Sequence, residues 1–228
     1  MTRHPPPIWT EMTAVFGGTF DPPHIGHLEA VRGVFLNPGI KSVIVIPSPA
    51  PPHKPTMASV QDRLEMTKIT FQNETGVFVD SREVERALKH PSRPSYTYDT
   101  LCELSAEIDK LVFAIGTDQF EKLPSWYRFP EILNLANWVV LVRQPGGQPE
   151  VLKLLNNWNT TGLVERYATN IWRLKSQQKF ISLVETNAPS VSSTKTREHI
   201  AQTGSPPPGW LTNGTWTYLK AHKLYGSN

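Results

Sequence analysis

Short apolar runs alternate along the chain with longer segments of helical spacing. Each run is followed by glycine, proline or polar residues. The six runs are residues 12–16, 41–46, 77–79, 111–115, 138–142 and 179–184. Short, bounded runs of β-branched and aromatic residues predict strands. The run at 41–46 is apolar at its last four positions, which is typical of a parallel strand buried on both faces.

The segments between these runs predict helices, because their apolar residues recur at three- and four-residue spacing. The predicted helices are residues 24–35, 59–70, 97–108 and 150–158, one that starts near residue 193, and 215–225. In the second helix Ser59 is the expected N-cap, and Arg63 and Glu65 are expected on the wetter face. Residues 148–179 are otherwise polar, and no pattern assigns residues 172–179 to a helix or a strand.

The chain has 228 residues, of which 39% are hydrophobic and 19% are charged. These values are ordinary for a globular α/β protein, either one domain or one domain with a small lobe. Three consecutive prolines forbid a helix within residues 1–11. We therefore expect a flexible arm there and a single domain over residues 12–228.

Composition excludes several classes of protein. The single cysteine, Cys102, excludes an internal disulfide framework and fits a reducing cytoplasm. No apolar run approaches the roughly 20 residues that span a bilayer, and residues 1–11 lack the apolar core of a secretory signal. The net charge of +3 suits a nucleic acid, but equally a small polyanion such as a nucleotide.

The most informative stretch is residues 17–28, GGTFDPPHIGHL, which joins the first predicted strand to the first predicted helix. Gly17 and Gly18 would let backbone N–H groups approach an anion, and the helix start adds a positive dipole end. His24 and His27 are three residues apart and would share a helix face, with the glycine between them leaving room for a ligand. Two imidazole donors there suit an oxyanion in a transition state.

An isolated pair of histidines has plainer explanations. The two could be surface residues in a proline turn, or they could bind zinc. Zinc lacks support, because a third ligand would have to come from elsewhere and the lone cysteine offers no paired thiol spacing.

Two further segments carry candidate phosphate ligands. Five prolines within residues 47–55 predict a rigid loop at the carboxyl end of a strand, from which Lys54 could reach a phosphate. At a later helix start, Ser193 and Thr194 would supply hydroxyl donors, and Arg197 could bind a phosphate through two bonds. Alternatively, Lys54 is an ordinary surface lysine and the second segment is a simple capped helix.

Aromatic and acidic residues mark two other loops. Thr97 could cap the helix that starts there, with the tyrosines on either side packing against it. Asp118 follows a glycine at the end of a strand, where it could accept a hydrogen bond from a ribose hydroxyl or cap a helix over 119–123. Trp126 lies in a loop that contains proline and serine. Its side chain either fills a gap between hydrophobic residues or stacks on a flat ring of a ligand.

These segments together resemble a known family. The strings are GGTFDPPHIGHL (17–28), PPHK (51–54), SYTYDTL (95–101), GTDQFEKLPSWYR (116–128) and VSSTKTR (191–197). In this order they are similar to the signatures of bacterial nicotinate mononucleotide adenylyltransferases, in the nucleotidylyltransferase superfamily. The resemblance covers residues 12–226 and implies a Rossmann-like, doubly wound parallel sheet with helices on both faces.

The resemblance implies transfer of AMP from ATP to nicotinate mononucleotide, which gives nicotinate adenine dinucleotide and pyrophosphate in NAD biosynthesis. The residues that match the family's ATP-binding positions are Gly17, Gly18, Thr19, Phe20, His24, His27, Gly116, Asp118, Ser193, Thr194 and Arg197. Those that match its mononucleotide-binding positions are Lys54, Tyr96, Thr97, Trp126 and Arg143. The implied catalytic residues are His24, His27, Lys54 and Arg197. Gln144 interrupts the family's usual Arg-Pro-Gly string after Arg143.

The implied reaction uses Mg²⁺ held mainly by phosphate oxygens and water, so no protein metal site is expected. We expect a cytoplasmic enzyme without a nucleic-acid or membrane partner, and a homo-oligomer is left open. The acceptor could also be nicotinamide mononucleotide, which has an amide in place of the carboxylate. The SYT and LPSWY strings argue against phosphopantetheine. A distant alternative is a class I tRNA-synthetase-like protein, because residues 24–27 spell HIGH, but no KMSKS string is present.

Overall fold

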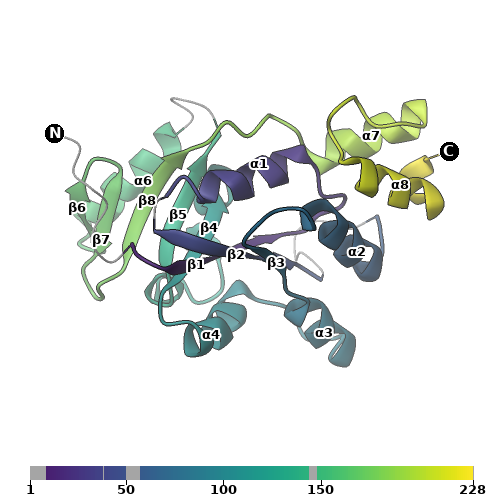
Figure 1. Ribbon diagram of the computed structural model, residues 1–228. Coiled ribbons are helices and arrows are strands. Elements are labelled where there is room, and N and C mark those ends of the chain that lie inside the picture. Colours follow the sequence, from purple (N-terminus) through teal and green to yellow (C-terminus); the bar gives the residue numbers. More distant parts are fainter. Residues whose placement is uncertain (1–8, 38, 50–56, 144–147, 228) are drawn as a thin grey trace. The chain divides into compact units, whose positions relative to one another are not determined.

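The computed structural model describes residues 9–37, 39–49, 57–143 and 148–227. Strands and helices follow one another along them, in places two or three of one kind in succession (Figure 1). The strands are β1 (Met12–Gly18), β2 (Ile40–Pro47), β3 (Val77–Val79), β4 (Leu111–Gly116), β5 (Asn137–Val142), β6 (Val164–Ala168), β7 (Ile171–Leu174) and β8 (Phe180–Glu185). The α-helices are α1 (Ile25–Val34), α2 (Val60–Phe71), α3 (Arg82–Lys89), α4 (Thr97–Glu107), α5 (Thr117–Phe120), α6 (Pro149–Thr160), α7 (Ser193–Thr203) and α8 (Asn213–Ala221). Short 3-10 turns are η1 (Leu123–Ser125), η2 (Glu131–Asn134) and η3 (Leu224–Gly226).

The strands form a sheet in the order β3-β2-β1-β4-β5-β8-β7-β6. Its first five positions have the order of a doubly wound Rossmann sheet. The pairs β1–β4, β4–β5 and β5–β8 are parallel, whereas β7 pairs antiparallel with both β6 and β8. The predicted Rossmann-like α/β class is therefore confirmed, with an antiparallel hairpin added to the parallel sheet.

The chain divides into two compact units. The first unit contains the described residues of Met1–Phe16, Ala30–Val43 and Tyr96–Asn187. The second unit contains those of Gly17–Glu29, Ile44–Ser95 and Ala188–Asn228. The sequence predicted a single domain over residues 12–228, and that remains a prediction.

The first unit is built on β4 and β5. Every residue of β5 and the first five residues of β4 are buried, as expected for parallel strands covered on both faces. The hairpin β6–β7 lies beside β8 (Figure 1). Most of the predicted arm, residues 1–8, lies outside the described residues. Of the rest, Trp9 is only 3% exposed.

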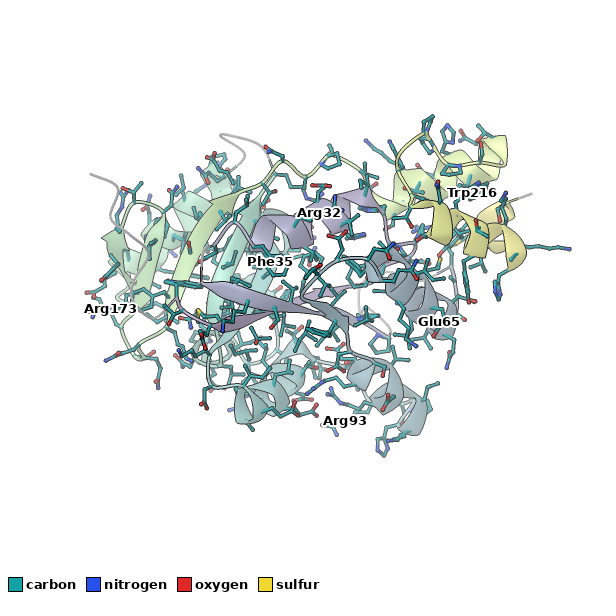
Figure 2. All side chains as sticks on the ribbon, viewed as in Figure 1. Arg32, Phe35, Glu65, Arg93, Arg173 and Trp216 are labelled. Carbon is teal, nitrogen blue, oxygen red and sulfur yellow. The ribbon has the colours of Figure 1, made fainter. Side chains whose placement is uncertain are left out.

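The second unit has its own apolar core under α2, α7 and α8. Ala58, Met66, Ile200 and Leu219 form the centre of this cluster. Partly buried residues pack around them, among them Trp216, which Figure 2 labels on α8. At the N-terminus of α2 the Ser59 side chain accepts from the backbone N–H of Asp62, so the predicted N-cap is confirmed.

Most predicted elements are found within one or two residues of their expected bounds. The exceptions are α3, which was not predicted, and the hairpin β6–β7, whose second strand begins the segment that no pattern assigned. The last helix was expected to reach residue 225, but α8 ends at Ala221 and is followed by η3. Two caps that were possible from the sequence are not found. The residue at the N-cap of α4 is Tyr96, not Thr97, and the residue at the N-cap of α5 is Gly116, not Asp118. Over the described residues, no helix combines the length and apolar character needed to cross a membrane.

The close approach of Trp9 to Gly39 yields a stability prediction. A Cβ on Gly39 would lie 1.5 Å from the backbone oxygen of Trp9, which cannot rotate away. We expect Gly39→Ala to lower the free energy of unfolding by about 2 kcal/mol, or the melting temperature by roughly 4–8 °C. Thermal unfolding checks this value.

Gly33→Ala is the matched control. There the obstructing atoms are Cγ2 of Thr186 at 2.5 Å and its Cβ at 3.0 Å, which belong to a side chain and not to the backbone, and alanine favours the helix. A loss at Gly39 no larger than that at Gly33 would contradict the proposed backbone clash.

Candidate active site

His24 and His27 lie together where β1 leads into α1. His24 immediately precedes α1 and is 2% exposed, whereas His27 lies in the first helical turn. Their rings stack, with centroids 3.7 Å apart and planes 20° apart. The backbone N–H of His24 donates to Nδ1 of His27 over 3.2 Å, so Nε2 carries the proton of the neutral His27 ring. The two imidazoles are therefore adjacent, although His24 lies outside the helix.

Aromatic rings occupy the space beside the glycines of this motif. A Cβ on Gly26 would lie 3.0 Å from the His24 ring, and a Cβ on Gly18 would lie 2.7 Å from the Phe20 ring. Phe20 is 1% exposed and meets His27 edge to face, with centroids 4.9 Å apart. The room expected for a ligand beside Gly26 is thus taken by His24. The Phe20 side chain packs against the His27 ring, and the expected contact of Phe20 with ATP stays a prediction.

The buried carboxylate of Asp21 collects donors from several segments of the second unit. Asp21 is 1% exposed. Its Oδ1 accepts from the Tyr225 hydroxyl at 2.6 Å and from the N–H of Ala58 at 3.1 Å. Its Oδ2 accepts from the N–H of Met57 at 2.9 Å and lies 3.7 Å from Nη1 of Arg197. These contacts satisfy a charged group that burial would otherwise make costly.

The start of α7 is anchored on the same loop. Ser192 caps the helix with its side chain. The Ser193 hydroxyl donates to the carbonyl oxygen of Pro22 at 2.9 Å, and Nη1 of Arg197 donates to that of Asp21 at 2.6 Å. The loop that precedes α1 thus also holds the N-terminal end of α7. Helix N-termini carry partial positive charge, which suits an anion.

Two donors near this loop, the first N–H of α1 and the predicted phosphate ligand Ser193, already donate inside the protein. The N–H of Ile25 donates to the carbonyl oxygen of Trp210 at 2.8 Å, and the Ser193 hydroxyl donates as described above. The Ser193 oxygen can still accept a hydrogen bond, but it is not poised to donate one to a phosphate. The imidazoles and Arg197 are therefore the stronger candidates for binding an anion here.

Arg63 was expected on the wetter face of α2, and this prediction is wrong. The side chain is 0% exposed. Its Nη1 donates to the carbonyl oxygens of Thr19 at 2.7 Å and Ser48 at 2.6 Å, and its Nη2 donates to that of Pro49. Burial lowers the pKa of Arg63, and the nearby Asp21 charge opposes this effect. The Arg63 guanidinium thus joins the loop after β1 to the loop after β2 by hydrogen bonds.

Tyr225, in η3, has φ 57° and ψ 21°, a left-handed conformation uncommon for residues other than glycine. Burial raises the pKa of its hydroxyl well above the usual range, and the hydrogen bond to Asp21 raises it further. The hydroxyl therefore remains a neutral donor at physiological pH. A similar bond joins the Tyr218 hydroxyl to Oδ1 of Asp62 at 3.0 Å, and there burial and Asp62 raise the pKa of Tyr218 to about 12.

In the first unit, the loop expected to bind the pyridine ring belongs to a cluster of tyrosines. Tyr96 stacks on Tyr127, with centroids 4.3 Å apart and planes 22° apart. Tyr98 meets Tyr127 edge to face at 6.0 Å, and the guanidinium carbon of Arg128 lies 4.7 Å from the centre of the Tyr98 ring. Tyr127 is 49% exposed, so the cluster reaches the surface of the unit. Thr97 is the first residue of α4, next to Tyr96.

The remaining candidates of the first unit follow the carboxyl ends of β4 and β5. Gly116 ends β4 and occupies the N-cap of α5, and Asp118 lies exposed within that helix. Trp126 is half-buried and meets Phe113 of β4 edge to face, with centroids 6.3 Å apart. Arg143 is exposed and follows β5 directly. Trp126 therefore both packs on the core of the unit and keeps part of its ring accessible.

The candidate residues are divided between the two units. The second unit contains Gly17, Gly18, Thr19, Phe20, His24, His27, Ser193, Thr194 and Arg197, and the first contains Tyr96, Thr97, Gly116, Asp118, Trp126 and Arg143. Lys54 lies outside the described residues. Asp21, Arg63 and Tyr225 were not predicted as residues of the site. For Asp21 a signal existed, because an acidic residue between a phenylalanine and two prolines inside a glycine motif is an unusual placement.

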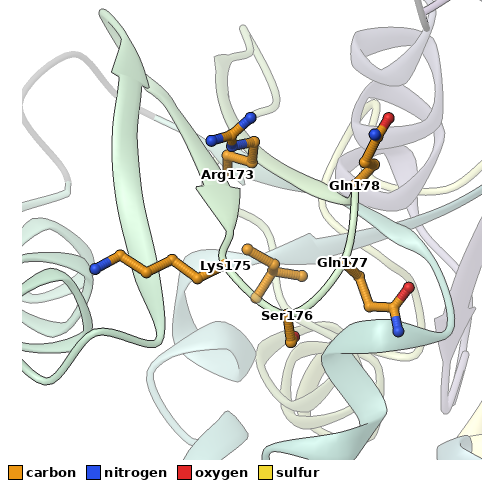
Figure 3. A pocket seen from close by; sticks show the side chains of 6 residues that line it. Arg173, Lys175, Ser176, Gln177 and Gln178 are labelled. Carbon is orange, nitrogen blue, oxygen red and sulfur yellow. The ribbon is translucent and has the colours of Figure 1, made fainter.

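A pocket of about 350 Å³ lies elsewhere in the first unit, at the turn between β7 and β8. It is lined by Arg173, Leu174, Lys175, Ser176, Gln177 and Gln178. The side chains of Lys175 and Gln177 point away from each other (Figure 3). None of these residues belongs to the candidate site, and the pocket is a hollow inside a polar turn. Within the described ranges, no three His, Cys, Asp or Glu side chains are grouped so that they could hold a metal ion.

Comparison with protein-family models identifies the broad class of this protein. The model of the cytidylyltransferase-like family matches residues 15–199. The matched part begins within β1 and ends within α7, so it includes both histidines and Arg197. The fold agrees with a solved structure of Plasmodium falciparum nicotinic acid mononucleotide adenylyltransferase complexed with NaAD. That structure is 16% identical, with a TM-score of 0.67, and the alignment covers 96% of this chain and 98% of the other.

Comparison with curated proteins identifies the family within this class. A protein of Aeromonas salmonicida named "Probable nicotinate-nucleotide adenylyltransferase" is 35% identical over 92% of this chain and 95% of its own length. A protein of Listeria monocytogenes with the same name is 30% identical over 93% of this chain and 96% of its own length. The chain therefore belongs to the nicotinate-nucleotide adenylyltransferase family within the cytidylyltransferase-like proteins.

The burial of Arg63 yields a second prediction. Arg63→Leu removes the donor from three carbonyl oxygens at once and leaves them short of partners inside the protein. We expect the free energy of unfolding to fall by about 3 kcal/mol, measured by urea denaturation. Lys68→Leu is the control on the same helix, because the Lys68 side chain is 48% exposed and pairs with the surface residue Glu65. The control should stay within about 0.5 kcal/mol of the parent protein. Equal losses in the two variants would contradict a special role for Arg63.

Proposed function

We propose that this protein transfers AMP from ATP to nicotinate mononucleotide, giving nicotinate adenine dinucleotide and pyrophosphate. The observation that carries the proposal is the arrangement around residues 21–27. There two stacked imidazoles, an arginine held by a buried aspartate, and the start of α7 meet on one loop. These groups are the donors that phosphates require. The relatives' names support this choice of acceptor.

In the proposed reaction a 5′-phosphate oxygen of the mononucleotide attacks the α-phosphorus of ATP in line. The new P–O bond forms as the bond to the oxygen bridging the α- and β-phosphates breaks, and that electron pair leaves with pyrophosphate. No protein nucleophile is needed. The protein holds two anions together and stabilises the charge that moves onto the leaving group.

The residues of the second unit would contact different phosphate groups, according to the donors that each side chain offers. His27 would donate from Nε2, since its Nδ1 accepts from the backbone N–H of His24. His24 would contact the transferring phosphate beside it. Arg197 would bind the β- or γ-phosphate with the guanidinium edge that Asp21 leaves available, and Thr194 would add its hydroxyl at the helix start. Lys54 would neutralise charge between the two substrates.

The acceptor would be read by residues of the first unit. Trp126 offers a partly exposed ring for stacking on the pyridine, and Tyr96 and Thr97 present main-chain N–H groups at the start of α4 for its carboxylate. Asp118 would accept from a ribose hydroxyl. Arg143, exposed after β5, would approach the mononucleotide phosphate.

Enzymes of this family generally use a divalent metal ion. We propose that the ion is Mg²⁺ and that it arrives on ATP, bound through phosphate oxygens and water. When bound, Mg²⁺ would withdraw charge from the phosphates.

The test of this proposal is pyrophosphate release with ATP and Mg²⁺, comparing nicotinate mononucleotide with its amide at equal concentrations. We expect kcat/KM to be on the order of 100-fold higher for the acid, because main-chain N–H groups donate to a carboxylate but cannot pair with the N–H donors of an amide. Comparable rates would indicate that the protein uses both acceptors. No release with either would overturn the proposed function and favour another nucleotidyl transfer.

The role of His27 is tested separately. His27→Ala should lower kcat by about 10², the cost of losing one donor to the developing charge in the transition state. The matched control is His199→Ala, because His199 lies on α7 and its Nδ1 contacts the carbonyl oxygen of Ser205, outside the proposed site. The control should keep near-parental turnover. Near-parental turnover of His27→Ala itself would rule out the phosphate role.

A further inference from the structure

Tyr225 reaches the phosphate-binding loop from a segment that neither the motifs nor the proposed chemistry includes. Its hydroxyl donates to Oδ1 of Asp21 over 2.6 Å, although the two residues are 204 positions apart. The turn that presents it is specialised. Lys223 and Tyr225 both have positive φ, at 52° and 57°, and the Ser227 hydroxyl anchors the turn by donating to the carbonyl oxygen of Leu219. Non-glycine residues stay in such conformations only where surrounding contacts hold them.

We propose that Tyr225 is a positioning residue of the phosphate site, which fixes Asp21 so that Asp21 holds the Arg197 guanidinium in the orientation that meets a nucleotide phosphate. This inference deepens the proposed function and rests on it for the identity of the ligand. Tyr225 itself would touch neither substrate.

The geometry supports each step of this chain of contacts. Nη1 of Arg197 makes two contacts with Asp21, a hydrogen bond of 2.6 Å to the main-chain oxygen and an approach of 3.7 Å to the carboxylate. Because a guanidinium is planar, fixing one of its nitrogens sets the direction of its other donors. The Arg197 side chain is only 13% exposed, so it has little freedom to find other orientations.

The hydrogen bond from Tyr225 fixes the orientation of the Asp21 carboxylate. The carboxylate can turn about its side-chain bonds only if its hydrogen bonds break. Two of these come from the backbone of Met57 and Ala58, just before α2, and the third comes from Tyr225. The tyrosine is the only side chain among these three donors, and a single substitution can therefore remove its bond. Its raised pKa keeps the proton on the hydroxyl, so the bond persists across the physiological range.

A purely structural role for Tyr225 is the alternative, because its ring packs against the apolar core under α2, α7 and α8. Tyr225→Phe separates the two roles, since it removes the hydroxyl and keeps the ring. The chain offers a matched control in Tyr218→Phe. Tyr218 packs on the same core and makes an equivalent bond to an aspartate, Asp62, that does not contact Arg197.

The experiment measures two quantities on the full chain of each variant. Calorimetry gives the Kd of ATP with Mg²⁺ present, and pyrophosphate release gives kcat with nicotinate mononucleotide. We expect Tyr225→Phe to raise the Kd about fivefold and to lower kcat about tenfold, because a small misplacement of a phosphate ligand is costly in rate. Tyr218→Phe should change both by less than about twofold.

The effect must also pass through Arg197. In an Arg197→Lys background the bidentate guanidinium is gone, so adding Tyr225→Phe should change kcat and Kd by less than about twofold. Similar effects of Tyr225→Phe in both backgrounds would overturn the proposal, as would effects no larger than those of Tyr218→Phe. A parent protein that binds ATP but releases no pyrophosphate would refute the proposed function, and the Kd values would still decide the role of Tyr225. A parent that does not bind ATP would refute both.

Discussion

The buried carboxylate of Asp21 is the group on which the phosphate-binding part of the molecule depends. Its partners come from three separate segments, namely the residues before α2, Arg197 on α7, and Tyr225 after α8. A buried charge that loses part of its hydrogen bonding costs more free energy than an ordinary bond contributes. The loop that carries His24 and leads into the first turn of α1, where His27 lies, is therefore coupled to all three segments.

Arg63 donates hydrogen bonds to carbonyl oxygens, whereas Asp21 accepts them from N–H and O–H groups. The two groups stabilise the same loop with opposite charges, and the Asp21 charge favours the protonated form of Arg63 against its burial. A rigid loop matters for the proposed chemistry, because no covalent intermediate is involved and rate enhancement must come from donors already in place. The cost of orienting these donors is met during folding, before a substrate binds.

The fold and the phosphate motif were predictable because both have local signals. Apolar runs located six of the eight strands, and a glycine turn between a strand and a helix indicated the site. The contacts made by Asp21, Arg63 and Tyr225 have no such signal, since each joins segments distant in sequence. Arg63 was misassigned because α2 buries a polar side as well as an apolar one, including Thr67 and Thr70, which bond back to the helix backbone. Thr97 and Asp118, the possible caps of α4 and α5, lie inside these helices, and the N-cap residues are Tyr96 and Gly116.

The division of the chain has an evolutionary consequence. The backbone passes from one compact unit to the other five times, after residues 16, 29, 43, 95 and 187. Neither unit is a continuous stretch of the gene, so neither could be exchanged between relatives by a single recombination event. If the acceptor is read by the first unit, its specificity must have diverged through point substitutions and changes in loops such as the one that carries Trp126. The phosphate chemistry of the second unit could be retained unchanged throughout that process.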